Sequence, residues 1–113
     1  MMTHLPRRDE AIIDIRKIED YCLSPSHPRG RHKARVFREA LGLQRSDAAW
    51  LRDVLLEAVR SSEASEVAVD AWGTYWRVDA TVTRQGWSAV VRTIWIVPTG
   101  EGVPRLVTCW VPR

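Results

Sequence analysis

The 113-residue chain has few cysteines, no long apolar run and no cluster of acidic residues, and each absence excludes some classes of protein. Its two cysteines, Cys22 and Cys109, stand in apolar contexts and outside any Cys/His ligand spacing, which predicts buried free thiols and no zinc site. No apolar run is long enough to span a membrane, and the first ten residues lack the apolar core of a signal peptide. The sequence has no cluster of Asp and Glu of the kind that forms a two-metal centre. We expect a soluble cytoplasmic protein with no metal and no cofactor.

The chain does contain enough apolar material for one folded domain. Its hydrophobic content is 45% and it includes six Trp, which suffices for a buried core in a domain of ordinary size. We expect a single domain over residues 1–113, with residues 1–10 as a flexible arm. The net charge of +3 is unevenly distributed, because residues 1–45 hold ten Lys and Arg against six Asp and Glu, whereas residues 46–113 hold seven against eight.

Apolar residues recur at helical spacing in the first half of the chain. The spacing predicts three helices, at residues 15–23, 31–41 and 48–61. Asp14 is placed to cap the first helix, Gly42 to end the second, and Ser46 or Asp47 to cap the third. Two prolines predict a loop over Ser24–Gly30, between the first and second helices.

In the second half, apolar and polar residues alternate. The alternation predicts strands at residues 76–83, 87–97 and 106–111. Arg84-Gln85-Gly86 predicts a tight turn, a further strand fits residues 67–72, and residues 11–14 fit a short extended piece. This order predicts an α+β fold in which two to three N-terminal helices pack on one face of a three- to four-stranded antiparallel meander.

The most basic stretch of the chain runs from Ser24 to Phe37. It holds two His, three Arg and one Lys around two Pro and one Gly. Imidazoles act as acids or bases near neutral pH, and guanidinium and ammonium groups neutralise phosphate oxygens. The stretch therefore predicts an anion site at a loop-to-helix junction.

Spaced residues across most of the chain also form a pattern. Its elements are Lys17-x-x-x-Tyr21-x-Leu23, Pro25-x-His27-Pro28-x-Gly30-x-x-Lys33-Ala34-x-x-Phe37, Leu41-Gly42, Trp72-Gly73, Val91–Ile96 and Pro104–Thr108. This pattern resembles a small bacterial family of unknown function, DUF6883. The resemblance implies a short α+β domain that stands alone or ends long polymorphic toxins, where a nuclease is often found. The order of elements is also similar to that of barnase/EndoU/colicin/RelE-like metal-independent ribonucleases.

A catalytic set for RNA cleavage can be proposed on these positions. His27 would act as general base or acid, and Lys33 would stabilise the phosphorane near the start of the second helix. Polar residues among the apolar strands would complete the site on the sheet: Thr93, Arg105 and Thr108. A further set would bind flanking phosphates as a nucleic-acid-binding track: Arg29, Arg31 and Arg35.

Structural explanations compete with these assignments. The His27 imidazole can be hydrogen-bonded to the backbone of a turn, the arginines can form a solvated helix face, and the threonines can be ordinary strand residues. Ion pairs would also remove a cation from the site: Lys33 with Glu39 or Asp14, and Arg105 with Asp79.

Two classes of function fit the sequence. The first is a nucleic-acid-directed, toxin-like enzyme, most simply a metal-independent ribonuclease. It would have RNA as substrate, a small cognate immunity or antitoxin protein as partner, and the cytoplasm of a target cell as its place of action. The alternative is a non-catalytic protein-interaction module that works with an operon-encoded partner. Binding of nucleic acid without cleavage fits the basic first half but has no recognisable motif.

Overall fold

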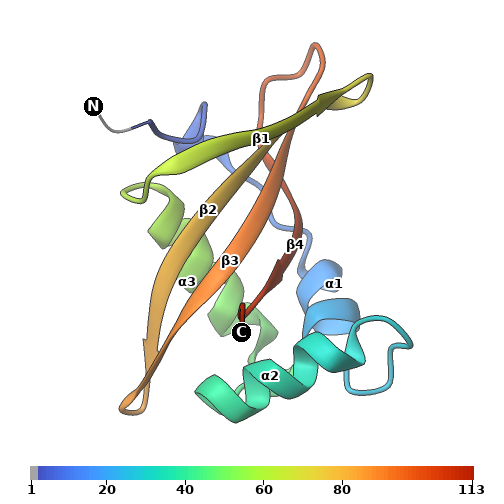
Figure 1. Ribbon diagram of the computed structural model, residues 1–113, viewed down its shortest axis with the longest axis vertical. Coiled ribbons are helices and arrows are strands. Elements are labelled where there is room, and N and C mark those ends of the chain that lie inside the picture. The colour runs from blue at the N-terminus through green and yellow to red at the C-terminus, as the bar shows by residue number, and fades with distance from the viewer. Residues whose placement is uncertain (1–2) are drawn as a thin grey trace.

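The computed structural model describes residues 3–113, with helices in the first half of the chain and strands in the second (Figure 1). The helical elements are η1 (Arg8–Glu10), α1 (Ile15–Lys17), η2 (Ile18–Cys22), α2 (Arg31–Leu41), η3 (Arg45–Asp47) and α3 (Ala48–Val59). The strands are β1 (Ala64–Asp70), β2 (Gly73–Arg84), β3 (Trp87–Pro98) and β4 (Arg105–Trp110). The predicted α+β fold is confirmed. Within residues 3–113, no helix has both the length and the apolar character needed to cross a bilayer.

The four strands form a meander in the order β1-β2-β3-β4, and every neighbouring pair is antiparallel. β2 and β3 pair along their whole lengths. Their turn residues, Gln85 and Gly86, have φ angles of 51° and 83°, the two positive values of a type I′ turn, whose twist matches that of the flanking strands. The expected tight turn is confirmed, and β1 supplies the further strand expected near residues 67–72.

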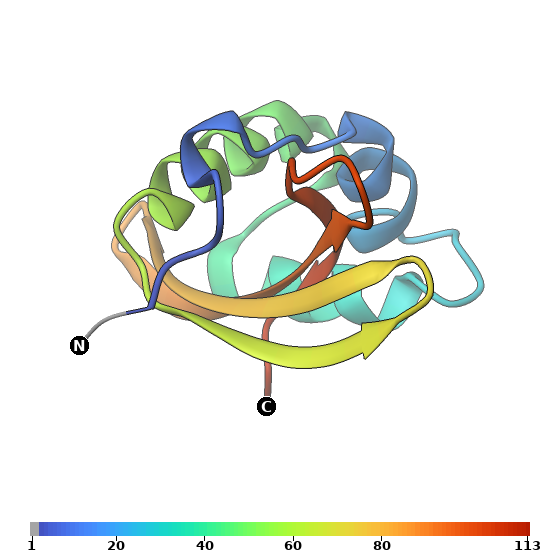
Figure 2. The same ribbon diagram turned by 90° about the horizontal axis from the view of Figure 1, so that it is seen from above.

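One face of the sheet is buried and the other is open to solvent. Val78, Ala80 and Val82 alternate along β2 and are at most 3% exposed, as in a strand with one face on the core. Between them, Asp79 points outward and accepts two hydrogen bonds from Arg92 of β3. α3 lies against the buried face, and α2 crosses one end of the sheet (Figure 1, Figure 2).

The first helical unit begins at its predicted capping residue. The Asp14 carboxylate accepts a hydrogen bond from the Arg16 backbone N–H at 3.0 Å, which confirms the cap. The Arg16 guanidinium donates to the same carboxylate and lowers the pKa of Asp14 to about 2. Beyond α1 the helix widens into the π-type turn η2, in which the Leu23 N–H bonds to the Ile18 carbonyl at 2.8 Å. η2 packs against β4.

The ends of the other two helices match the prediction to different degrees. α2 spans Arg31–Leu41 as predicted and ends at Gly42, whose φ of 66° is left-handed. Asp47 occupies the N-cap position of α3, one of the two residues predicted for it, but its side chain makes no capping hydrogen bond to this helix. The Asp47 carboxylate instead accepts the Gln44 N–H at 2.9 Å, which places the capping box at the preceding turn η3.

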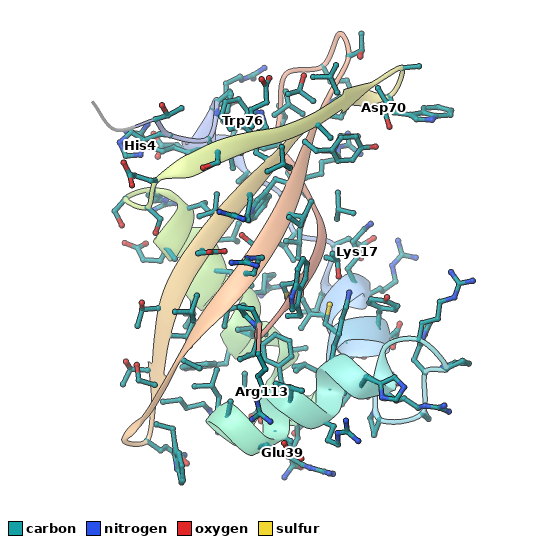
Figure 3. All side chains as sticks on the ribbon, in the orientation of Figure 1. His4, Lys17, Glu39, Asp70, Trp76 and Arg113 are labelled. Carbon is teal, nitrogen blue, oxygen red and sulfur yellow. The ribbon has the colours of Figure 1, made fainter. Side chains whose placement is uncertain are left out.

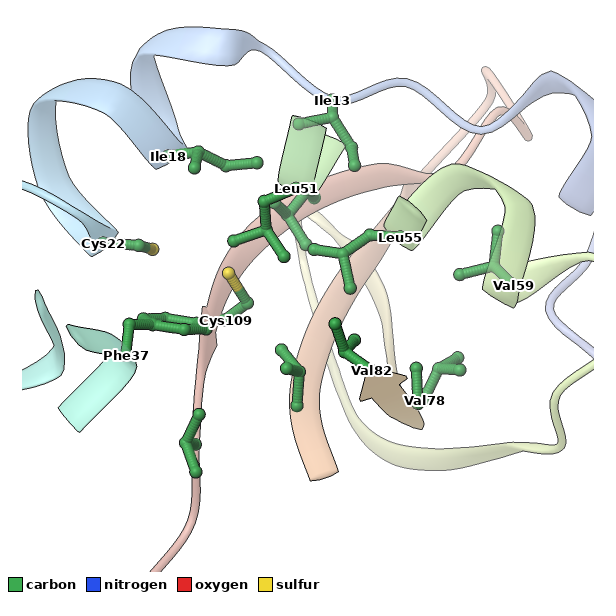
Figure 4. Close-up of a cluster of buried hydrophobic side chains, with 14 of the residues drawn as sticks. Ile13, Ile18, Cys22, Phe37, Leu51, Leu55, Val59, Val78, Val82 and Cys109 are labelled. Carbon is green, nitrogen blue, oxygen red and sulfur yellow. The ribbon is translucent and has the colours of Figure 1, made fainter. Parts of the chain in front are cut away.

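A continuous hydrophobic core fills the space between the helices and the sheet (Figure 4). Its members include Trp95 of β3, Phe37 of α2, and Leu51 and Leu55 of α3, all 0% exposed. Burial of each such side chain contributes about 1.5–3 kcal/mol relative to leaving it in water. Both cysteines belong to this core as free thiols, as predicted.

The N-terminal segment packs against this core, whereas a flexible arm was expected over residues 1–10. Leu5 is 1% exposed, and the Thr3 carbonyl accepts the Ala64 N–H at 2.7 Å. An isolated leucine among polar residues gives no periodic signal, so the sequence pattern did not reveal this docking. Residues 1–2 of the expected arm lie outside the described residues.

Contacts at both ends of β4 hold this edge strand to the helical half. The Ile12 N–H bonds to the Pro104 carbonyl at 2.9 Å, and the Leu106 N–H bonds to the Ile12 carbonyl at 3.0 Å. This parallel bridge confirms the extended piece expected at residues 11–14. Beyond the other end of β4, the Arg113 guanidinium bonds to Glu39 of α2 at 2.8 Å (Figure 3). β4 is thereby linked to the helical half beyond both of its ends.

Candidate active site

Side chains from separate parts of the chain meet around the ring of Tyr21, in η2. The imidazole of His27 packs edge-on against this ring, with the two ring centroids 4.7 Å apart. Lys33 Nζ, from α2, lies 4.8 Å from the Tyr21 centroid and 5.2 Å from that of Trp110 in β4. We refer to these residues, together with Thr108, as the Tyr21 cluster. Three residues predicted to be catalytic, His27, Lys33 and Thr108, belong to it.

The Lys33 ammonium is the charged centre of the Tyr21 cluster. It donates a hydrogen bond to Thr108 Oγ1 at 2.8 Å, and the faces of two aromatic rings attract it. Neither suggested ion pair forms, because Glu39 and Asp14 each pair with an arginine. Across residues 3–113, none of the ion pairs involves Lys33. The cluster therefore holds an unneutralised cation that an anion can approach.

His27 holds the turn that precedes α2. Its Nδ1 accepts the backbone N–H groups of Arg29 at 3.0 Å and of Gly30 at 2.9 Å, so the imidazole is bonded to the backbone, as the structural explanation proposed. A ring whose Nδ1 accepts carries its hydrogen on Nε2 when neutral. In this state His27 can donate to an anion through Nε2 but has no free lone pair to accept a proton.

Gly30 allows the loop before α2 to touch η2. A Cβ atom at this position would lie 2.1 Å from the Tyr21 carbonyl oxygen, a distance that no side chain tolerates. The backbone therefore requires glycine at this position. Because only hydrogen fits, the loop and the helix start lie directly on Tyr21, which sets the positions of His27 and Lys33.

Thr108 connects the cluster to the buried thiols. Its Oγ1 lies 3.8 Å from Cys22 Sγ. A hydrogen bond from the Cys109 thiol lowers the pKa of Cys22 to about 6, against the effect of burial, and Thr108 and Lys33 lower it further. The same hydrogen bond, together with burial, raises the pKa of Cys109 well above its usual value. The contact between the two thiols therefore shifts their pKa values in opposite directions.

Two residues of the predicted catalytic set lie outside the cluster. Thr93 is 0% exposed; its hydroxyl donates to the Val78 carbonyl at 2.6 Å and accepts from Trp95 Nε1 at 2.7 Å. Arg105 begins β4, at the opposite end from Trp110, and pairs with Glu101 at 2.9 Å rather than with Asp79. The structure explains Thr93 through core bonding and Arg105 through a surface ion pair.

The predicted phosphate track is divided by the helix. Arg29 is exposed in the loop, whereas Arg31 and Arg35 line a cleft of about 1040 Å³ between α2 and the start of α3. Each of these two arginines is two positions from Lys33, which is roughly 200° around a helix axis. Neither His27 nor Lys33 lines the cleft. The arginines and the Tyr21 cluster therefore lie on different flanks of α2.

Sequence reasoning missed two aromatic members of the cluster. Tyr21 stood in the family-like pattern beside Leu23, but no role followed from its position. Trp110 gave no signal, since its place depends on the pairing of β4 with β3. Over the part of the chain that the structure describes, no group of three or more His, Cys, Asp or Glu side chains is placed to hold a metal ion.

The chain belongs to the family described as a domain of unknown function (DUF6883), whose model matches residues 4–113. The resemblance drawn from the sequence is thereby confirmed. No curated protein matches the sequence. Among solved structures, a chain of the contact-dependent growth inhibition toxin–immunity protein complex from Klebsiella pneumoniae 342 is similar, with a TM-score of 0.67 and 16% identity. The match covers 89% of this chain and 99% of that chain, and the two share a fold.

Proposed function

We propose that the protein is a nucleic-acid-directed, toxin-like domain that cleaves RNA without a metal at the Tyr21 cluster. The observation that carries the proposal is the unneutralised Lys33 ammonium, hydrogen-bonded to Thr108 and close to the ring that also contacts His27. An ammonium, a hydroxyl and an imidazole N–H are the donors that bind a phosphodiester.

The chemistry assigned to the cluster is stabilisation of charge. The RNA 2′-oxygen would attack phosphorus, its proton passing to water. The bond from phosphorus to the 5′-oxygen would break, and this oxygen would take up a proton from water, which leaves a 2′,3′-cyclic phosphate and a 5′-hydroxyl. Lys33 Nζ and His27 Nε2–H would bind the oxygens on which charge develops, which is commonly the largest catalytic contribution. The bonding of His27 Nδ1 supports this role over that of general base, one of the two roles, base or acid, expected from the sequence.

The comparisons support the toxin-related part of the proposal. The similar solved chain comes from a complex of a growth inhibition toxin with its immunity protein, and the family resemblance implies domains that end polymorphic toxins. Both would place the action of this domain in the cytoplasm of a target cell and would give it a cognate protein partner.

Cleavage of a labelled oligoribonucleotide in EDTA tests the proposal, with a DNA of the same sequence as the control substrate. We expect the wild type to cleave only the RNA, since DNA has no 2′-hydroxyl. Lys33→Met should lower the rate about 10²–10³-fold, the usual cost of removing a group that stabilises the transition state.

The matched control is Lys17→Met, which removes the other lysine, an exposed one with no ion pair within the described residues (Figure 3). It should cleave at the wild-type rate. Absence of cleavage by the wild type, or equal rates for the two lysine variants, would overturn the proposal. Induced expression in a bacterium gives a second readout, because Lys33→Met should relieve any growth arrest.

A protein-interaction module is the second candidate function, and the cleft on the far flank of α2 favours it. Such a module would form a stoichiometric complex with an operon-encoded partner and would bind it equally well after Lys33→Met. Retained binding together with no RNA cleavage by the wild type would select this function.

A further inference from the structure

A cleft of about 1040 Å³ lies between α2 and the start of α3, and we refer to it as the α2–α3 cleft. It is lined by side chains of η2, the loop after it, α2, η3 and the start of α3. The cleft is separate from the Tyr21 cluster, because none of the cluster residues lines it.

One wall of the cleft carries uncompensated positive charge. Arg31, Arg35 and Arg38 are exposed, and within residues 3–113 none of the three takes part in an ion pair or a side-chain hydrogen bond. On the opposite side Arg45 is neutralised, because it bonds to Asp20 at 2.7 Å and to the Glu19 carbonyl at 3.1 Å. Of the arginines that line the cleft, those without an ion pair therefore all belong to α2.

The floor of the cleft, which its buried lining residues form, is apolar. Leu23, Ala34 and Ala48 are at most 6% exposed, and Ala49 lies beside them. The three arginines follow one another at i, i+4 and i+7 on α2, with rises of about 6 Å and 4.5 Å along the axis. An apolar floor bordered by cations at helical spacing is complementary to one face of an amphipathic helix.

The composition of the cleft separates two classes of acidic ligand. Grooves for single-stranded nucleic acid combine basic residues with aromatic rings on which bases stack. No Trp, Tyr or Phe stands among the lining residues, while the apolar floor offers contacts that a phosphate backbone does not use. Carboxylates pair with guanidinium groups in a bidentate geometry, and an acidic helix presents both carboxylates and apolar side chains.

We propose that the α2–α3 cleft binds an acidic amphipathic helix of a partner protein. Its carboxylates, spaced at i, i+4 and i+7, would pair with Arg31, Arg35 and Arg38, and its small apolar residues would lie over Ala34 and Ala48. This proposal does not rest on RNA cleavage, since the cleft and the Tyr21 cluster occupy different flanks of α2.

Fluorescence anisotropy with the full chain tests the proposal. The probe is a labelled helical peptide with Glu at i, i+4 and i+7 and Ala or Leu on the same face; the comparison ligands are its Gln counterpart and a labelled single-stranded RNA. We expect the Glu peptide to bind and the Gln peptide to bind more weakly. Double charge reversal at Arg31→Glu and Arg35→Glu should raise the Kd of the Glu peptide more than about tenfold, because like charges then face each other.

The matched control is the double charge reversal at Arg8→Glu and Arg77→Glu. It changes the net charge equally, at arginines that are outside the cleft and make no ion pair in the described part of the chain. This control and Lys33→Met should both keep the wild-type affinity, with unchanged thermal unfolding in every variant. Equal affinity of the two double variants, or an RNA that binds through Arg31 and Arg35 where the Glu peptide does not bind, would overturn the proposal.

Discussion

His27 stabilises the turn before α2, and this structural role can be measured separately from any catalytic role. Its Nδ1 accepts two backbone N–H groups before α2, as the oxygen of a helix-capping Asn or Asp does. His27→Ala removes this acceptor and should lower the free energy of unfolding by about 1 kcal/mol, within the usual range for a lost cap. His27→Asn retains an acceptor oxygen and should cost less.

Urea unfolding of the two variants checks this prediction, and an RNA cleavage assay separates the structural role of His27 from its role in binding the substrate. Asn restores an acceptor for the backbone but places no donor where Nε2–H lies, so both variants should lose cleavage while His27→Ala loses more stability than His27→Asn. Equal stability of His27→Ala and the wild type would show that the two hydrogen bonds do not hold the loop. The measurement therefore distinguishes a capping histidine from one that also binds the substrate.

Two threonines show what residue type alone does not decide. Thr93 and Thr108 both stand among apolar strand residues, yet the first bonds inside the core and the second contacts Lys33. Strict alternation in β4 would place Leu106 and Thr108 on the same face, but the register shifts between Ile94 and Trp95. This irregularity buries Leu106 and Cys109 together, and the position of a bulge is not encoded in a period-two pattern.

At the scale of elements, the contact between Gly30 and η2 holds the candidate site together. Gly30→Ala would bring Cβ to 2.1 Å from the Tyr21 carbonyl oxygen, so the start of α2 must move away from η2. We expect a loss of about 1–3 kcal/mol in the free energy of unfolding, as for other overpacked sites. Two-dimensional NMR should show shifts of the Tyr21 ring and the Trp110 indole.

Gly100→Ala is the matched control for backbone strain. Gly100 has a φ of +85° and nothing within 4 Å of an added Cβ, so its substitution costs stability through conformation alone, by about 1 kcal/mol. It should leave the Tyr21 and Trp110 signals unmoved. Unmoved signals in Gly30→Ala as well would mean that the cluster does not depend on this close approach.

Most helices and strands could be predicted from the sequence because the residues that begin or end each of them lie within or next to it. The positive φ available to Gly42 ended α2 where expected, and the two-residue turn at Gln85-Gly86 joined β2 to β3. The grouping of elements was harder to predict. Tyr21 and Trp110 are far apart in the sequence, and they meet at Lys33 only after β4 has paired with β3 and η2 has packed on β4.

At the scale of the whole molecule, α2 carries two different surfaces around one buried stripe. Ala34, Phe37 and Leu41 face the core, Lys33 faces β4 on one flank, and the arginines face the cleft on the other. A ligand in the cleft would therefore leave Lys33 uncovered. The basic run is continuous in the sequence, but the helix divides it between two separate surfaces.

The N-terminal segment packs on the hydrophobic core, on the same side of the sheet as α3 (Figure 2), and its contribution to stability can be measured. Leu5 is 1% exposed in the core, and Thr3 bonds to Ala64 at the start of β1. Leu5→Ala should therefore lower the free energy of unfolding by about 2–5 kcal/mol, the cost of a cavity left by a buried leucine. Ile12→Ala, at a side chain 47% exposed, removes a similar amount of apolar surface and should cost less, because part of it is already in water.

Urea unfolding compares the two variants. If Leu5→Ala cost no more than Ile12→Ala, the segment would lie outside the cooperative core, and the flexible arm expected from the sequence would be the better description.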